Sequence, residues 1–191
     1  LSAWRRAGVL DVGLLWTMIA FNSLPSFWLG MLLISIVSVN WGWLPSFGAV
    51  TPASGYTGWA KLADIARHTV LPAFTLAVVS IPNIYITMRY SMLSVLGHDF
   101  IRTARAKGLT ESSVLFRHVL RNALAPVVTV LALRLGSAFG GAVVVETVFS
   151  YPGLGRLIFE AVAGRDYPVM QAAFLLLTVA VLLSNLLADL L

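Results

Sequence analysis

The sequence contains no cysteine and few charged residues. The absence of Cys from the 191 residues excludes disulfides, thiolate metal sites and cysteine nucleophiles. Charged residues make up 11% of the chain, whereas a soluble domain usually carries about 25%. Hydrophobic residues make up 59%. This composition predicts a polytopic membrane protein and argues against a soluble domain.

The usual sequence signals of nucleotide and metal chemistry are also missing. No Gly-rich motif ending in Lys-Ser/Thr is present, so we do not expect the chain itself to bind or hydrolyse ATP. His68, His98 and His118 have no closely spaced partner, whereas a zinc site wants about four ligands at tight spacing. We therefore expect neither a metal site nor a catalytic residue. The net charge of +5 is explained by the basic cytoplasmic loops of membrane proteins, so no nucleic-acid partner is expected.

Four apolar stretches are long enough to cross a bilayer as helices, which takes about 20 residues. We predict an all-α protein with transmembrane helices at about residues 12–39, 69–88, 124–145 and 167–188. The first stretch is long and contains Pro25. A proline removes one backbone hydrogen bond and should kink the helix. The alternative is that Pro25 divides this stretch into two short helices.

The basic residues set the orientation of the four spans. One side of the membrane would hold the two chain ends and the middle loop, and it carries more Lys and Arg than the other side. The positive-inside rule then places the loop at 91–123 in the cytoplasm and the loops at 40–68 and 146–166 outside. Pro and Gly in the loop at 40–68 suggest turns more than regular structure. Its aromatic residues suit a membrane interface; they are Trp41, Trp43, Tyr56 and Trp59.

The cytoplasmic loop is predicted to form a short helix, a break at Gly108 and a second helix. Thr110 is a suitable N-cap, and Glu111 suits the positive start of the helix dipole. Leu109 falls at the break, and apolar residues follow at helical spacing: Val114, Leu115, Val119 and Leu120. Such a segment either presents a rigid knob to another protein or lies as an amphipathic helix on anionic lipid. The residue pattern alone leaves both interpretations open.

The segment from Ile101 to Pro126 resembles the EAA loop of ABC importer permeases, in the form used by the peptide and nickel subfamily. Gly108 stands at the glycine of the family pattern. Arg102 stands where the general pattern has Glu, and Arg121 stands where it has Pro. Together with His118 and Asn122, these departures match the peptide branch.

The resemblance extends over essentially the whole chain. It includes three further motifs: Ser23-Leu24-Pro25-Ser26-Phe27-Trp28, Glu146-Thr147-Val148-Phe149-Ser150-Tyr151-Pro152-Gly153-Leu154-Gly155, and Arg165-Asp166-Tyr167-Pro168 with Gln171. The family normally has six spans, and this chain resembles spans three to six. The resemblance therefore implies a partial type I transmembrane domain that lacks the first two spans.

The resemblance implies a permease subunit of an ATP-driven importer in a bacterial or archaeal cytoplasmic membrane. The implied substrates are dipeptides or oligopeptides, with glutathione or nickel as alternatives. The implied partners are a second homologous permease, two nucleotide-binding ATPase subunits and an extracytoplasmic binding protein that docks on the 40–68 and 146–166 side. ATP and Mg²⁺ would be used by the ATPase subunits. The loop would contact an ATPase through Arg102, Ala104, Gly108, Leu109 and Glu111.

Polar residues at membrane depth are candidates for the transport pathway. Arg134 falls near the middle of the third span, where a charge is costly and indicates function. It would line the pathway, or else pair with a polar group of a partner helix; a shifted span would also account for it. Asn22, Ser23 and Asn83 would line a hydrated route, or else satisfy backbone groups freed near prolines.

Two other classes of function stay open at the level of sequence. A membrane-embedded enzyme would use His98, Asp99 and His118, which would have to converge at a pocket. A channel or scaffold would work without a motor subunit. Co-purification of an ATPase through the loop would separate the importer from both.

Overall fold

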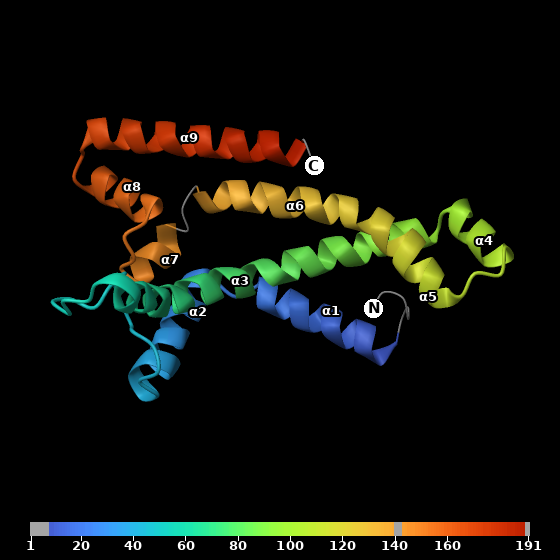
Figure 1. Ribbon diagram of the computed structural model, residues 1–191, viewed down its shortest axis with the longest axis horizontal. Coiled ribbons are helices and arrows are strands. Elements are labelled where there is room, and N and C mark those ends of the chain that lie inside the picture. The colour runs from blue at the N-terminus through green and yellow to red at the C-terminus, as the bar shows by residue number, and fades with distance from the viewer. Residues whose placement is uncertain (1–7, 140–142, 190–191) are drawn as a thin grey trace. The chain divides into compact units, whose positions relative to one another are not determined.

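The computed structural model describes residues 8–139 and 143–189, and within these ranges the chain is helical and has no β-strand. The all-α prediction is therefore confirmed. The helices are α1 (Val9–Asn22), α2 (Ser26–Leu33), η2 (Ile34–Asn40), α3 (Gly58–Leu96), α4 (Asp99–Ala106), α5 (Glu111–Ser113), η3 (Val114–Leu120), α6 (Arg121–Phe139), α7 (Val143–Val148), α8 (Leu154–Ala163) and α9 (Tyr167–Asp189), shown in Figure 1. The segments η2 and η3 are π-helical.

Three helical stretches in the described residues are long and apolar enough to cross a membrane. They are Gly58–Leu96, Glu111–Leu131 and Tyr167–Leu186. A fourth is counted if Val9–Asn22 and Ser26–Asn40 form one broken span. The sequence predicted four spans, which is the larger of these counts, but one candidate begins at Glu111, inside the loop predicted at 91–123, whereas we placed the start of that span at about residue 124.

The first predicted span is interrupted at Pro25, where we expected one kinked helix. Pro25 is the N-cap of α2, with φ −65° and ψ 136°. Proline has no N–H to donate, and its ring disfavours the helical conformation of the preceding residue, Leu24. The alternative form of the prediction, with two short helices, is therefore the one the structure has.

Two segments that we predicted as loops contain helix. α3 begins at Gly58, so residues 58–68 are helical. The buried carboxylate of Asp64 accepts hydrogen bonds of 2.7 Å from the N–H and the hydroxyl of Thr51, which anchors this turn of α3 to the preceding loop. α8 occupies Leu154–Ala163 and buries Ile158 and Ala161 on one face. Both helices depend on contacts with distant residues, which turn-forming residues in the sequence do not reveal.

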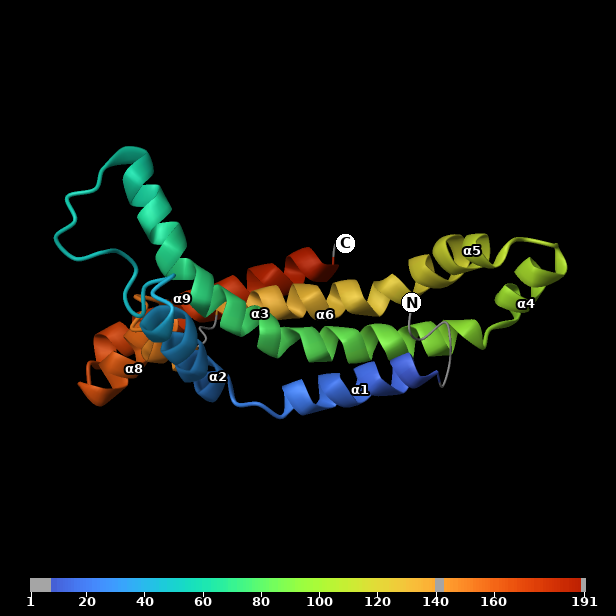
Figure 2. The ribbon, with the colours of Figure 1, turned by 90° about the horizontal axis from the view of Figure 1, so that it is seen from below.

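The chain divides into two compact units. Unit 1 contains residues 1–23, 80–134 and 187–191, and unit 2 contains residues 24–79 and 135–186. In unit 1, α1 runs beside the later part of α3, and α4 lies beyond the end of α3 (Figures 1 and 2). The core of unit 1 gathers side chains from α3, α4, η3 and α6: Met92, Val95, Ile101, Ala104, Val114, Leu115, Val119 and Ala123.

The core of unit 2 is built around Phe149, which follows α7 and is 2% exposed. Its buried neighbours come from η2, α3 and α7: Ile34, Leu71 and Val145. The ring also packs closely against α2, since a Cβ on Gly30 would lie 3.1 Å from Phe149 Cε2. The Phe149 carbonyl accepts the Gly48 N–H at 2.9 Å, which joins the loop before α3 to this core.

We expect Phe149→Ala to lower the free energy of unfolding by about 3–5 kcal/mol, because it empties a packed aromatic site. Unfolding of the detergent-solubilised protein, followed by tryptophan fluorescence, would measure the change. Phe159→Ala is the matched control, since Phe159 is 53% exposed on α8. Equal losses for the two variants would contradict the packing that we describe.

Candidate functional site

The segment from His98 to Pro126 forms a helical hairpin, hereafter the 98–126 hairpin, whose first arm ends in a left-handed turn. The Gly108 N–H donates to the Arg105 carbonyl at 2.9 Å, and the Leu109 N–H donates to the Ala104 carbonyl at 3.4 Å. Gly108 itself has φ +76°. This pair of bonds around a left-handed residue is the Schellman motif, which satisfies the last carbonyls of a helix. The predicted break at Gly108 is confirmed.

The second arm begins two residues later with a side-chain cap. Thr110 Oγ1 accepts the Ser113 N–H at 3.4 Å, and the Thr110 carbonyl accepts the Val114 N–H at 3.0 Å. Glu111 occupies the first turn of α5, where its charge suits the helix dipole. The predicted N-cap is therefore confirmed.

An ion pair bridges the two arms across the turn. Arg105 Nε lies 3.0 Å from Glu111 Oε1, and Arg105 Nη2 lies 3.1 Å from Glu111 Oε2. The side chains are 45% and 59% exposed, respectively. An exposed pair of this kind contributes about 0–1 kcal/mol. It favours one arrangement of the turn, while most of the hairpin's stability comes from its core.

The inner faces of the two arms share one apolar core. Ile101 from α4 and Val114 and Val119 from η3 are each 0% exposed. Met92 and Val95 of α3 pack into the same cluster. Because the arms and the end of α3 bury each other's side chains, the hairpin is a rigid extension of unit 1.

Four of the five predicted contact residues lie on the outer surface of the hairpin. The side chain of Arg102 is 80% exposed, and that of Glu111 is 59% exposed. Leu109 is 40% exposed, and a Cβ on Gly108 would meet no atom within 4 Å. Ala104 differs, because it is 5% exposed within the core. The structure thus gathers Gly108, Leu109 and Glu111 at the turn and gives Ala104 a packing role.

Two of the predicted pathway residues come together in unit 1. Asn83 Nδ2 on α3 donates to Asn22 Oδ1 at the end of α1, at 3.1 Å. Ser23 Oγ donates instead to the Ile19 carbonyl at 3.1 Å, which is a local bond of α1. The side chain of Arg134 lies outside the described residues.

The described part of the chain contains no group of three or more His, Cys, Asp or Glu residues that could hold a metal ion. The His98 ring stacks on Phe100 with 5.7 Å between centroids. Asp99 Oδ1 lies 3.5 Å from Arg102 Nη1. His98 and Asp99 each contact a residue of the first arm.

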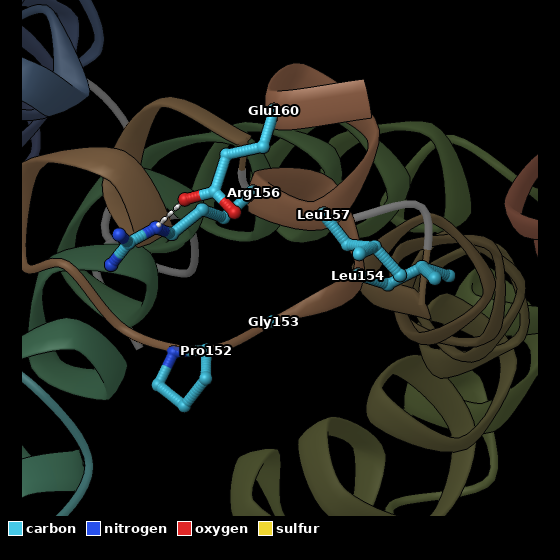
Figure 3. Close-up of a pocket in the computed structure, with 6 residues that line it drawn as sticks. All are labelled: Pro152, Gly153, Leu154, Arg156, Leu157 and Glu160. Carbon is cyan, nitrogen blue, oxygen red and sulfur yellow. Dashed lines mark hydrogen bonds and ion pairs between the residues drawn. The ribbon is translucent and has the colours of Figure 1, made fainter. Parts of the chain in front are cut away.

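A carboxylate organises the second motif, in unit 2. Glu146 Oε2 accepts the Arg156 N–H at 2.8 Å, so it caps the first turn of α8. The pocket beside this turn is lined by Pro152, Gly153, Leu154, Arg156, Leu157 and Glu160 (Figure 3). Within it Arg156 Nε lies 2.6 Å from Glu160 Oε1, so the two charges of the pocket neutralise each other.

A sequence comparison identifies the family to which the chain belongs. The family described as "Binding-protein-dependent transport system inner membrane component" matches residues 1–191. The chain belongs to this family. Combined with three or four candidate spans, membership makes the chain a multi-pass membrane protein.

Named members of this transport family are similar over the whole chain. The oligopeptide transport system permease protein AppB of Bacillus subtilis is 44% identical and is matched over 59% of its length. The dipeptide transport system permease protein DppB of Escherichia coli K12 is 42% identical and is matched over 61% of its length. The glutathione transport system permease protein GsiC of Pectobacterium atrosepticum is 44% identical, over 57% of its length. In each case the match covers 100% of this chain, so the chain spans about three fifths of these relatives.

Sequence reasoning did not predict the charged contacts of this chain, and three of them shape the two units. They are the Arg105–Glu111 ion pair, the Glu146 cap of α8, and an ion pair between Asp11 on α1 and Arg89 on α3. The Asp11–Arg89 pair could have been predicted. Asp11 precedes the first predicted span and Arg89 follows the second, and we placed these two span ends on the same side of the membrane.

We expect Thr110→Ala to weaken the start of the second arm by about 1 kcal/mol, because the Ser113 N–H loses its acceptor. Amide exchange at Ser113 and Val114, whose N–H groups bond to Thr110, should then quicken about fivefold. Hydrogen–deuterium exchange with mass spectrometry measures this. Thr110→Ser retains the hydroxyl and should keep the original rate. An unchanged rate in Thr110→Ala would contradict the cap.

Proposed function

We propose that the chain is the permease subunit of an ATP-driven importer that moves dipeptides or oligopeptides across a bacterial or archaeal cytoplasmic membrane. The observation that carries the proposal is the 98–126 hairpin, taken together with family membership. The hairpin is rigid inside and presents Leu109, Glu111 and the backbone at Gly108 on its outer turn. A rigid hairpin with an exposed turn can transmit a displacement that a bound protein imposes on it.

In this proposal the hairpin lies in the cytoplasm and seats in a groove of a separate ATPase subunit. Binding of ATP and Mg²⁺ by two such subunits would move the hairpin, and the helices would alternate between inward-open and outward-open states. This is a two-state element biased by a ligand bound at a distant site. The chain itself contributes no catalytic group to ATP hydrolysis. A second, homologous permease completes the membrane part.

The substrate class rests on the relatives. Oligopeptide and dipeptide permeases are 44% and 42% identical to this chain. Glutathione is the second candidate substrate, because a glutathione permease is also 44% identical. Glutathione is itself a small peptide, so all three relatives favour a peptide over nickel. The extracytoplasmic binding protein, which would dock on the side of residues 40–68 and 146–166, would select among these substrates.

Reconstitution tests the proposal directly. The full-length permease would be assembled in liposomes with its partner permease, ATPase subunits and binding protein, and uptake of labelled dipeptides, oligopeptides, glutathione and Ni²⁺ would be compared. ATP-dependent uptake of a peptide supports the proposal. Uptake that does not need ATP would favour a channel and contradict it.

We expect Gly108→Arg to leave the protein folded and inserted but to abolish transport coupling. A side chain at φ +76° costs about 1–2 kcal/mol of conformational free energy. We expect the packing of the hairpin core to offset this cost. The added side chain would stand on the open outer face, where the ATPase is proposed to bind. Substrate-stimulated ATPase activity and uptake in liposomes are the measurements.

Gly108→Ala separates backbone strain from added bulk. It carries a similar conformational cost but adds only a methyl group, so it should retain most of the coupling. Loss of coupling in Gly108→Ala to the same extent would assign the effect to backbone strain. Normal coupling in Gly108→Arg would contradict the proposed contact.

A further inference from the structure

A buried ion pair joins two helices of unit 1 that are far apart in the sequence. Arg89 Nη2 on α3 lies 2.9 Å from Asp11 Oδ2 on α1, and Arg89 Nε lies 3.1 Å from Asp11 Oδ1. The Asp11 side chain is 1% exposed and the Arg89 side chain is 17% exposed. Two parallel hydrogen bonds between a guanidinium and a carboxylate fix direction as well as distance.

Arg89 is placed beside the base of the 98–126 hairpin. The next turn of α3 carries Met92, which is 3% exposed in the hairpin core, and Met88 packs against the same core. Met92 thus joins the hairpin core one turn beyond Arg89, while Arg89 itself bonds to α1. The hairpin core and the attachment of α1 therefore lie on neighbouring turns of α3.

The other end of α1 is attached to the same helix through the Asn22–Asn83 hydrogen bond of 3.1 Å. Asp11 pairs with the later residue of α3 and Asn22 with the earlier one, so the two helices run antiparallel. Asp11 and Asn22 are separated by about 16 Å of helix at 1.5 Å per residue. The ion pair and the asparagine pair are therefore links at opposite ends of α1.

We propose that Asp11 and Arg89 are positioning residues for energy coupling: their ion pair makes α1 move with α3 and the hairpin as one body. Replacing either partner removes both hydrogen bonds between Arg89 and the buried Asp11 carboxylate, and with them the fixed direction and distance of the link. Through the Asp11–Arg89 ion pair, a displacement of the hairpin is transmitted along α1 to the Asn22–Asn83 hydrogen bond. This inference rests on the proposed function, because it takes the hairpin as the part that an ATPase moves.

The test measures peptide transported per ATP hydrolysed by the complete importer in liposomes. Asp11→Asn and Arg89→Gln should lower this ratio about five- to tenfold, within the usual range of allosteric coupling, while ATP hydrolysis continues. A variant that only misfolds would lose both activities and the assembled complex on size exclusion.

A reversible cross-link separates positioning from simple stability. The 191 residues contain no cysteine, so Asp11→Cys with Arg89→Cys introduces the one thiol pair within them. A short bifunctional thiol reagent with a reducible bond would join them. We expect the joined protein to regain most of the wild-type ratio and to lose it again on reduction. Asp11→Cys alone and Arg89→Cys alone, treated with the same reagent, are the matched controls and should stay uncoupled.

The results distinguish a failure of the proposed function from a failure of the inference about the ion pair. A wild-type complex that transports without ATP would overturn the proposed function, and this inference with it. A wild-type complex that needs ATP, together with an unchanged ratio in Asp11→Asn, would overturn the inference alone. A lowered ratio that the cross-link does not restore would also overturn it, since linkage is then not what the pair provides.

Discussion

The left-handed backbone at Gly108 is the constraint on which the 98–126 hairpin depends. If α4 continued as a helix through this residue, the chain would not reverse direction and the second arm would not pack against the first. The reversal instead places Ile101 of the first arm against Val114 and Val119 of the second, where all three are 0% exposed. Glycine allows the reversal because it adopts positive φ without the clash of a Cβ. One local conformation thus determines a core, and the core determines how stiffly the exposed tip is held.

Polar side chains in the apolar helices have two different kinds of partner. Several hydroxyls in the described helices bond to the carbonyl four residues earlier, as Ser23, Thr75 and Thr178 do. Such a bond satisfies the hydroxyl within its own helix, so it carries no information about a hydrated route. The Asn22–Asn83 bond is different, because it joins residues 61 apart in the sequence. Among the described pathway candidates, these two asparagines are the ones whose partner is tertiary.

The features that could be predicted from the sequence are those determined by neighbours along the chain. The break at Gly108 and the cap at Thr110 are of this kind, because each follows from the residue's own backbone and hydroxyl preferences. Pro25 is intermediate: the sequence located the disturbance and left open whether it was a kink or a break. The helical start of α3 and the whole of α8 were missed, since they depend on the contacts of Asp64 with Thr51 and of Glu146 with Arg156.

The sequence did not reveal which of the predicted contact residues are buried. Ala104 lies in the matched motif and was assigned to the contact surface with its neighbours. In the structure it is 5% exposed, and its carbonyl closes the turn by accepting the Leu109 N–H. A small residue fits here because the position packs inside the hairpin. Membership of a motif therefore does not separate residues that touch a partner from residues that shape the surface.

Two of the glycines in the matched motifs, at positions 108 and 153, are required for different reasons. Gly108 has φ +76° and open space around it, so conformation is what demands glycine there. Gly153 has φ −114°, which any residue adopts, but a Cβ at this position would overlap the Glu146 carboxylate. Gly153 is therefore required for its lack of a Cβ, which leaves room for the Glu146 carboxylate to reach the first turn of α8. The first glycine shapes the exposed turn of the hairpin, and the second admits the acidic cap of α8.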